Sequence, residues 1–125
     1  MKAEFDADIP IYVQIAESIE DDILRGLISE ESQVMSTNQL ASHYRINPAT
    51  AAKGLNMLVN DNILYKKRGL GMFVASGAAE KIQAKRTSSF YEKFVLPLVR
   101  EAKGLGISRD TIRQMVDKAE GNGDE

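Results

Sequence analysis

Apolar side chains recur at every fourth position near the start of the chain. This spacing places them on one face of an amphipathic helix, which we expect over residues 11–25. Pro10 suits the first turn of that helix because its ring fixes a helical φ angle, and Gly26 suits its C-terminal end. The stripe consists of Ile11, Ile15, Ile19 and Ile23.

Two shorter helices are predicted next, separated by a tight turn. Ser36 and Gln39 stand three residues apart, as in a capping box, so a short helix is expected to begin here. Asn47 and Pro48 predict the start of the following helix, because Asn is a preferred N-cap and Pro fits the first helical position. That helix is expected to run to about Asn60. A helix followed by such a pair is typical of a helix-turn-helix unit.

A β-hairpin is predicted directly after these helices. Residues 63–65 and 72–75 have the composition of short strands, and the stretch between them is basic and contains two glycines. We therefore expect a hairpin with its tip at residues 66–71. Ser76 and Gly77 end this unit, so the first domain is expected to span residues 1–77.

The second domain, residues 78–125, is expected to be a helical hairpin. Pro97 interrupts the longer helix and predicts a kink or break near Phe94, and Ser108 is placed to cap the shorter helix. Two isolated helices cannot hide the apolar side chains that they carry, and burying each one fully is worth about 1.5–3 kcal/mol. These side chains either pack on the first domain or pair with a second copy of the chain. We favour a homodimer, with an interface formed by Phe90, Phe94, Leu98, Ile112 and Val116.

Charge is distributed unevenly along the chain, although the net charge is only −2. Residues 1–31 carry a net charge of −7, residues 32–100 carry +7, and residues 101–125 carry −2. Because salt screens distant charges within about 10 Å, the basic middle can still attract a polyanion. The alternative is an ordinary solvated surface of lysine and arginine.

Composition excludes several other classes of protein. The chain has 125 residues, 43% of them hydrophobic, which suffices for a small core. Cysteine is absent, which excludes disulfides, a cysteine nucleophile and thiolate metal ligands, and His43 is the single histidine. We therefore expect no metal, no cofactor and no enzyme activity. The absence of a long apolar run predicts no membrane partner and a cytoplasmic protein.

The helix-turn-helix and the basic hairpin together suit duplex DNA. The second helix of such a pair fits the major groove, and the hairpin can reach the backbone and the minor groove. The candidate residues near the two helix starts are Ser36, Thr37, Asn38, Asn47, Ala49, Thr50 and Lys53. Those of the hairpin are Lys66, Lys67, Arg68, Gly69 and Gly71. Each also has a simpler interpretation, as a helix cap, a surface residue or a turn residue.

These segments resemble the GntR family of bacterial transcription regulators. Residues 9–15 resemble the family's opening, residues 36–41 its second-helix motif, and residues 68–74 its arginine-glycine-x-glycine-x-phenylalanine-valine wing motif. The short helical tail is similar to that of the YtrA-type subfamily. The resemblance implies a mainly α (α+β) fold: a winged helix-turn-helix with a two-stranded wing, then a C-terminal dimerisation hairpin. It further implies a dimeric regulator that binds a palindromic operator, and we expect a repressor because a bound dimer can occlude a promoter.

The sequence also departs from the family pattern. Family members usually carry proline-serine-x-arginine before the second helix, and here Asn38 stands at the position of that arginine. Ala49, Ala51 and Ala52 leave the next helix poor in long polar side chains. The alternative function is therefore a protein-interaction module without DNA affinity. The tail is too short for the large metabolite-binding domain of longer relatives, so the small-molecule effector is unknown. The sequence does not give the operator or the regulated genes.

Overall fold

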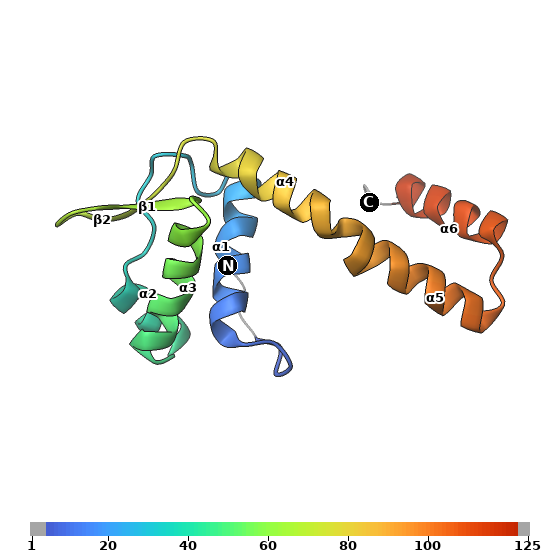
Figure 1. Cartoon of the computed structure of the whole chain (residues 1–125), viewed down its shortest axis with the longest axis horizontal. Coiled ribbons are helices and arrows are strands. Elements are labelled where there is room, and N and C mark those ends of the chain that lie inside the picture. The colour runs from blue at the N-terminus through green and yellow to red at the C-terminus, as the bar shows by residue number, and fades with distance from the viewer. Residues whose placement is uncertain (1–4, 123–125) are drawn as a thin grey trace. The chain divides into compact units, whose positions relative to one another are not determined.

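The computed structural model describes residues 5–122 and is mostly helical (Figure 1). Helices α1 and α2 are followed by α3 and the paired strands β1 and β2, and then by the helices of the C-terminal part. The predicted winged helix-turn-helix with a small two-stranded wing is confirmed. The elements are α1 (Ile11–Leu24), α2 (Thr37–Tyr44), α3 (Pro48–Asn60), β1 (Leu64–Lys67), β2 (Gly71–Val74), α4 (Ala78–Phe90), the π-helix η1 (Tyr91–Val95), α5 (Leu96–Leu105) and α6 (Arg109–Asn122).

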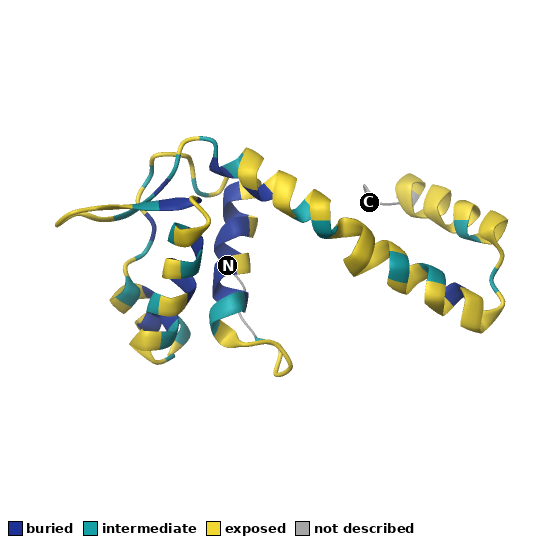
Figure 2. Cartoon of the chain, viewed as in Figure 1, coloured by how far each residue is buried: buried dark blue, intermediate teal, exposed yellow. Residues whose placement is uncertain are grey.

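The core of the winged helix lies between α1, α2, α3 and the base of the hairpin (Figure 2). Helices α1 and α3 approach closely at Gly54, where an added Cβ would lie 2.9 Å from the backbone oxygen of Tyr12. The predicted apolar stripe of α1 contributes to this core, although Ile11 at its start is exposed. The largest fully buried side chains are Ile15, Ile19, Leu40, Leu55, Leu58, Ile63, Leu64, Val74 and Ile82.

Local capping signals set the ends of α2 and α3. The Ser36 hydroxyl accepts a hydrogen bond of 3.1 Å from the Gln39 backbone N–H, and the Gln39 side chain accepts one from the Ser36 N–H. Asn47 caps α3 by accepting a 2.8 Å hydrogen bond from the N–H of Ala49, and Pro48 occupies the first helical position. The predicted capping box and the predicted start of α3 are therefore both confirmed.

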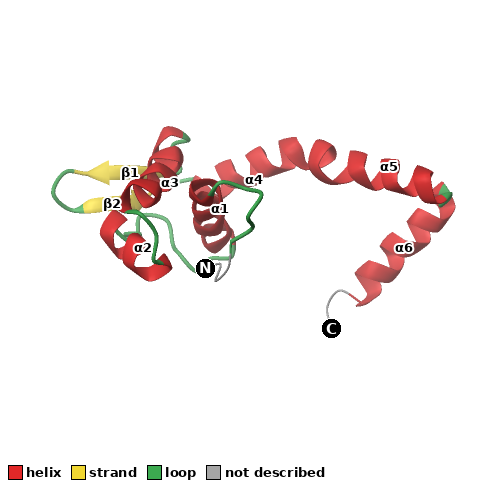
Figure 3. Ribbon diagram, turned by 90° about the horizontal axis from the view of Figure 1, so that it is seen from below, coloured by secondary structure: helices red, strands yellow, loops and turns green. Residues whose placement is uncertain are grey.

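The wing is longer than predicted. Lys66 pairs with Met72 and Lys67 with Gly71, so three residues that we placed in the tip lie in the strands (Figure 3). The connecting loop before α2 also pairs with the hairpin, since the Val34 N–H donates to the Met72 carbonyl at 3.0 Å. An isolated bridge joins Gln33 to Phe73. Part of the predicted loop therefore pairs with β2 and supports the wing.

The compact unit that contains the winged helix ends at Lys85, beyond the predicted boundary at residue 77. Ala78 and Ile82 are buried in its core, so the start of α4 packs on the winged helix. The Lys85 ammonium contacts the buried carboxylate of Glu20 and lies 3.5 Å from Asp61. The functional division into residues 1–77 and 78–125 remains a prediction.

The second compact unit starts at Arg86 and contains the predicted break. Residues Tyr91–Val95 form a π-helical turn, and Pro97 follows it. Pro97 has no N–H to donate to the carbonyl four residues earlier. The loss of this hydrogen bond is consistent with the wider π-helical turn that precedes it. Ser108 caps α6 as predicted, accepting a 3.1 Å hydrogen bond from the Thr111 N–H.

The two glycines near the end of the sequence predict a frayed tail over residues 121–125, and this prediction is partly wrong, because α6 continues through Gly121 to Asn122. Residues 123–125 of that tail lie outside the described residues. Among the helices that the structure describes, none combines the length and the hydropathy needed to cross a membrane.

Candidate nucleic-acid interface

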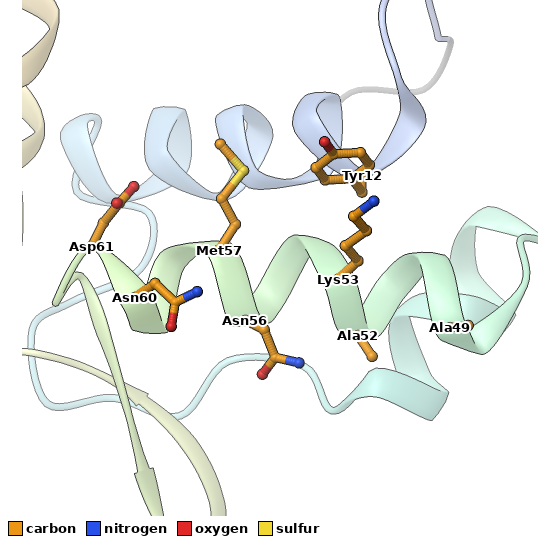
Figure 4. Close-up of a pocket in the computed structure, with 8 residues that line it drawn as sticks. All are labelled: Tyr12, Ala49, Ala52, Lys53, Asn56, Met57, Asn60 and Asp61. Atoms are coloured by element: carbon orange, nitrogen blue, oxygen red, sulfur yellow. The ribbon is translucent and has the colours of Figure 1, made fainter.

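One side of α3 is open to solvent along the whole helix. Ala49, Lys53, Asn56 and Asn60 are exposed at helical spacing, whereas Leu55 and others on the opposite side are buried. An open groove of about 600 Å³ runs over this exposed side (Figure 4). It is lined by Tyr12, Ala49, Ala52, Lys53, Asn56, Met57, Asn60 and Asp61.

The candidate residues of α3 differ in how available they are. Ala49 is exposed, and Thr50 is half-buried at the edge of the open side. Asn47 is exposed, but its side-chain oxygen Oδ1 already accepts a hydrogen bond from the N–H of Ala49. A bidentate contact with adenine uses both the oxygen and the nitrogen of the amide, so the capping bond favours a structural role for Asn47.

Lys53 leans toward α1 rather than away from the molecule. Its ammonium lies 4.2 Å from the centre of the Tyr12 ring, a cation–π contact (Figure 4). Asn56, one turn later, points away from α1 in the same view. The exposed side of α3 therefore has a cationic edge beside α1 and an amide edge opposite.

The start of α2 contributes the candidate residues Ser36, Thr37 and Asn38. Ser36 is used as the helix cap, Thr37 is half-buried and Asn38 is exposed. The first N–H groups of a helix carry a partial positive charge and are suited to an anion. Thr37 and Asn38 stand where they can add hydrogen bonds to such a contact.

The wing presents exposed basic side chains on a constrained backbone. Lys66, Lys67 and Arg68 are all exposed. Gly69 and Gly71 have φ angles of 77° and 116°, which favour glycine. The Lys67 ammonium lies 4.4 Å from the centre of the Phe73 ring, which orders the stem of the wing.

A residue that the sequence analysis missed holds the wing tip. The Gln33 side-chain amide donates a 2.7 Å hydrogen bond to the Leu70 carbonyl. A Cβ at Gly71 would lie 2.7 Å from the same Gln33 nitrogen, so Gly71 also provides space for this contact. Nothing in the local pattern around Gln33 signals this role, because its partner is far along the chain.

Helices α2 and α3 and the wing contain no acidic residue of their own, although Asp61 lines one end of the α3 groove and Glu31 contacts Tyr65 of the wing. The sequence has no Asp or Glu between Glu31 and Asp61, or between Asp61 and Glu80. The hydrogen bond to the Glu31 carboxylate raises the pKa of Tyr65, and burial raises the pKa of Tyr44. Both tyrosines are therefore neutral near pH 7, and the charge of these elements comes from their lysines and arginines.

Residues 11–74 match the family described as bacterial regulatory proteins, gntR family. The repressor NagR of Bacillus subtilis is 33% identical over 73 residues, which cover 58% of this chain and 30% of NagR. The regulator YhcF of the same organism is 27% identical over 112 residues, covering 88% of this chain and 89% of YhcF. The B. subtilis repressor YtrA is 22% identical over 107 residues, covering 86% of this chain and 82% of YtrA. The chain thus spans less than a third of NagR but most of YhcF and YtrA.

Solved structures are also similar to this chain. A transcriptional regulator of the GntR family from Bacteroides thetaiotaomicron has 37% identity and a TM-score of 0.71, covering 86% of this chain and 94% of that one. The DNA-binding domain of AraR, in complex with operator ORE1, has 27% identity and a TM-score of 0.52. The match covers 60% of this chain and 94% of the AraR chain. The similarity to YtrA supports a YtrA-type assignment. The chain belongs to the GntR family of bacterial regulatory proteins.

Proposed function

We propose that the chain is a dimeric repressor that binds a palindromic DNA operator, with α3 in the major groove and the wing on the adjacent backbone. The observation that carries this proposal is that α2, α3 and the wing contain no acidic residue, while the open side of α3 is combined with three exposed basic residues of the wing. Basic elements without acidic residues suit the phosphates of DNA. The AraR domain, which has a similar fold, was solved with operator DNA.

The individual contacts follow from the chemistry of each element. The residues at the start of α3 face the base edges, where the methyl groups of Ala49 and Thr50 can touch thymine. Lys66 and Arg68 neutralise phosphates on either side of the wing. The start of α2 binds a further phosphate through backbone N–H groups, Thr37 and Asn38.

Dimerisation is supported by the apolar surface of the second unit. Phe90 is 48% exposed and Phe94 is 63% exposed, and their rings contact each other with centres 5.3 Å apart. Among the described residues, neither belongs to the core cluster of the winged helix. Leu98, Ile112 and Val116 line an apolar groove of about 390 Å³ between α5 and α6. We assign this surface to a second copy of the chain.

A homodimer fits the expected operator. A two-fold axis relates identical surfaces, so two copies of α3 meet two half-sites of opposite orientation. A dimer bound over a promoter can prevent transcription by occupying the site. NagR and YtrA are both named as repressors, which supports repression by this chain as well.

Selection of bound duplexes from a random pool tests the proposal. We expect enrichment of a palindromic sequence at low salt, together with a dimeric mass for the protein in sedimentation. Failure to enrich any duplex would overturn DNA binding and would favour the protein-interaction module. Enrichment of a single, non-repeated half-site by a monomeric protein would overturn the dimer and its palindrome.

A further inference from the structure

We propose that Asn56 reads an adenine in each half-site, so that the main base-reading amide lies in the middle of α3 rather than at its start. This inference rests on the proposed function, because it assigns a role within the same DNA interface. It concerns a residue that neither the helix caps nor the wing motif indicates.

The position of Asn56 on α3 is the first argument. Asn56 is exposed and follows Ala49 by two turns and Ala52 by one turn on the same side of the helix. The two alanines carry only methyl groups, so this side of α3 can approach the base edges in the DNA major groove closely. Seven residues of α-helix rise about 10 Å, which is about three base-pair steps of 3.4 Å. Asn56 therefore stays within the groove when α3 lies along it.

The second argument is that the polar side chains nearer the start of α3 already have a partner in the protein or are partly buried. The Asn47 oxygen accepts the N–H of Ala49, and the Lys53 ammonium lies over the Tyr12 ring. Thr50 is half-buried. In the part of the chain that the structure describes, no hydrogen bond is formed by the Asn56 amide, which leaves its donor and its acceptor for a ligand.

The chemistry of the amide then selects the base. The NH2 group of an asparagine side chain donates to N7 of adenine while its oxygen accepts from the N6 amino group, and adenine offers both groups at one edge in the major groove. Asn60 carries the same amide one turn later, but it is the last residue of α3 and precedes the Asp61 carboxylate. That negative charge disfavours a close approach of the DNA at Asn60. Asn56 is thus the amide best placed for adenine.

Duplex selection with variants of the full chain tests this assignment. For Asn56→Ala we expect one position in each half-site to lose its preference for adenine, and affinity for the wild-type consensus to fall about 5- to 150-fold. Asn56→Leu, which has a similar shape but loses both the donor and the acceptor, is expected to do the same. The matched control is Asn60→Ala, for which we expect the selected sequence to be unchanged. Circular dichroism of each variant checks that the helices are retained.

The outcomes separate this inference from the proposed function. If the wild-type chain selects an operator and Asn56→Ala selects the same one with equal preference for adenine, the inference fails and DNA binding stands. If Asn56→Ala, while folded, weakens binding to all duplexes equally, base reading by Asn56 is also overturned. If the wild-type chain selects no duplex, the proposed function itself fails.

Discussion

The amide of Gln33 and the carbonyl of Leu70 are joined by a 2.7 Å hydrogen bond, although 37 residues separate them along the chain. This contact connects the loop before α2 to the tip of the wing. Leu70 is 63% exposed, and within the hairpin its backbone N–H donates a 2.9 Å hydrogen bond to the Lys67 carbonyl. The orientation of the wing therefore depends on a residue that lies outside the hairpin.

Replacing Gln33 with Ala is expected to loosen the wing tip without unfolding the domain. Loss of one exposed hydrogen bond costs about 0.5–1.5 kcal/mol, and we expect a similar loss in DNA affinity, about 2- to 10-fold. NMR relaxation of the Gly69 and Gly71 amides measures the change in mobility. Gln83→Ala, at an exposed position of α4, is the control. Unchanged relaxation in Gln33→Ala would show that the hydrogen bond does not hold the tip.

Replacing Gly54 with Ala is expected to destabilise the winged helix. The new Cβ would lie 2.9 Å from the Tyr12 oxygen and 3.2 Å from Ile15 Cγ2, so α1 and α3 must separate. Overpacking of this kind costs about 1–3 kcal/mol, which exceeds the gain of up to about 1 kcal/mol in helix propensity. Urea unfolding measures the difference. Gly104→Ala in α5 is the control, because a Cβ there meets nothing within 4 Å. Equal or greater stability of Gly54→Ala would contradict the close packing.

Replacing Lys85 with Met is expected to weaken the attachment of α4 to the winged helix. Lys85 contacts Glu20, whose side chain is 3% exposed, so the substitution removes a cation beside a buried carboxylate. We expect a loss of about 1–3 kcal/mol in the free energy of unfolding. A double-mutant cycle with Glu20→Gln isolates the pair. Additive effects of the two substitutions would show that the contact contributes no coupling energy.

Replacing Phe94 with Glu is expected to produce monomers. Phe94 is the most exposed of the five predicted interface residues, and a buried carboxylate in a dimer is unfavourable. Sedimentation velocity measures the change in mass. Phe94→Leu keeps an apolar side chain and is expected to remain dimeric. A dimer that persists in Phe94→Glu would place the interface elsewhere.

Features set by neighbouring residues could be predicted from the sequence. Ser36 with Gln39, and Asn47 with Pro48, fix two helix starts through contacts within a few residues. The local sequence is therefore sufficient to predict where these helices begin. The π-helical turn near Phe94 was predicted as a break for the same reason, because Pro97 lacks an N–H. The basic and glycine residues of the wing likewise identified the hairpin.

Features that depend on distant partners could not be predicted in this way. Gln33 holds Leu70, and Lys53 lies over Tyr12, through contacts that exist only after the chain folds. Asn56 and Asn60 are different, since their exposure follows from the helical spacing of the buried Leu55 and Leu58. Extending that spacing along the whole of α3 would have found both amides.

The dependence of DNA affinity on salt tests the central claim most directly. A surface that neutralises several phosphates is expected to lose affinity by orders of magnitude between about 50 and about 200 mM salt. Replacing Lys66 and Arg68 together with Ala is expected to reduce the slope of log affinity against log salt by about 2, whereas Lys103→Ala with Lys118→Ala leaves it unchanged. An unaltered slope in the wing variant, or no duplex binding by the wild-type chain at the lower salt concentration, would contradict the account.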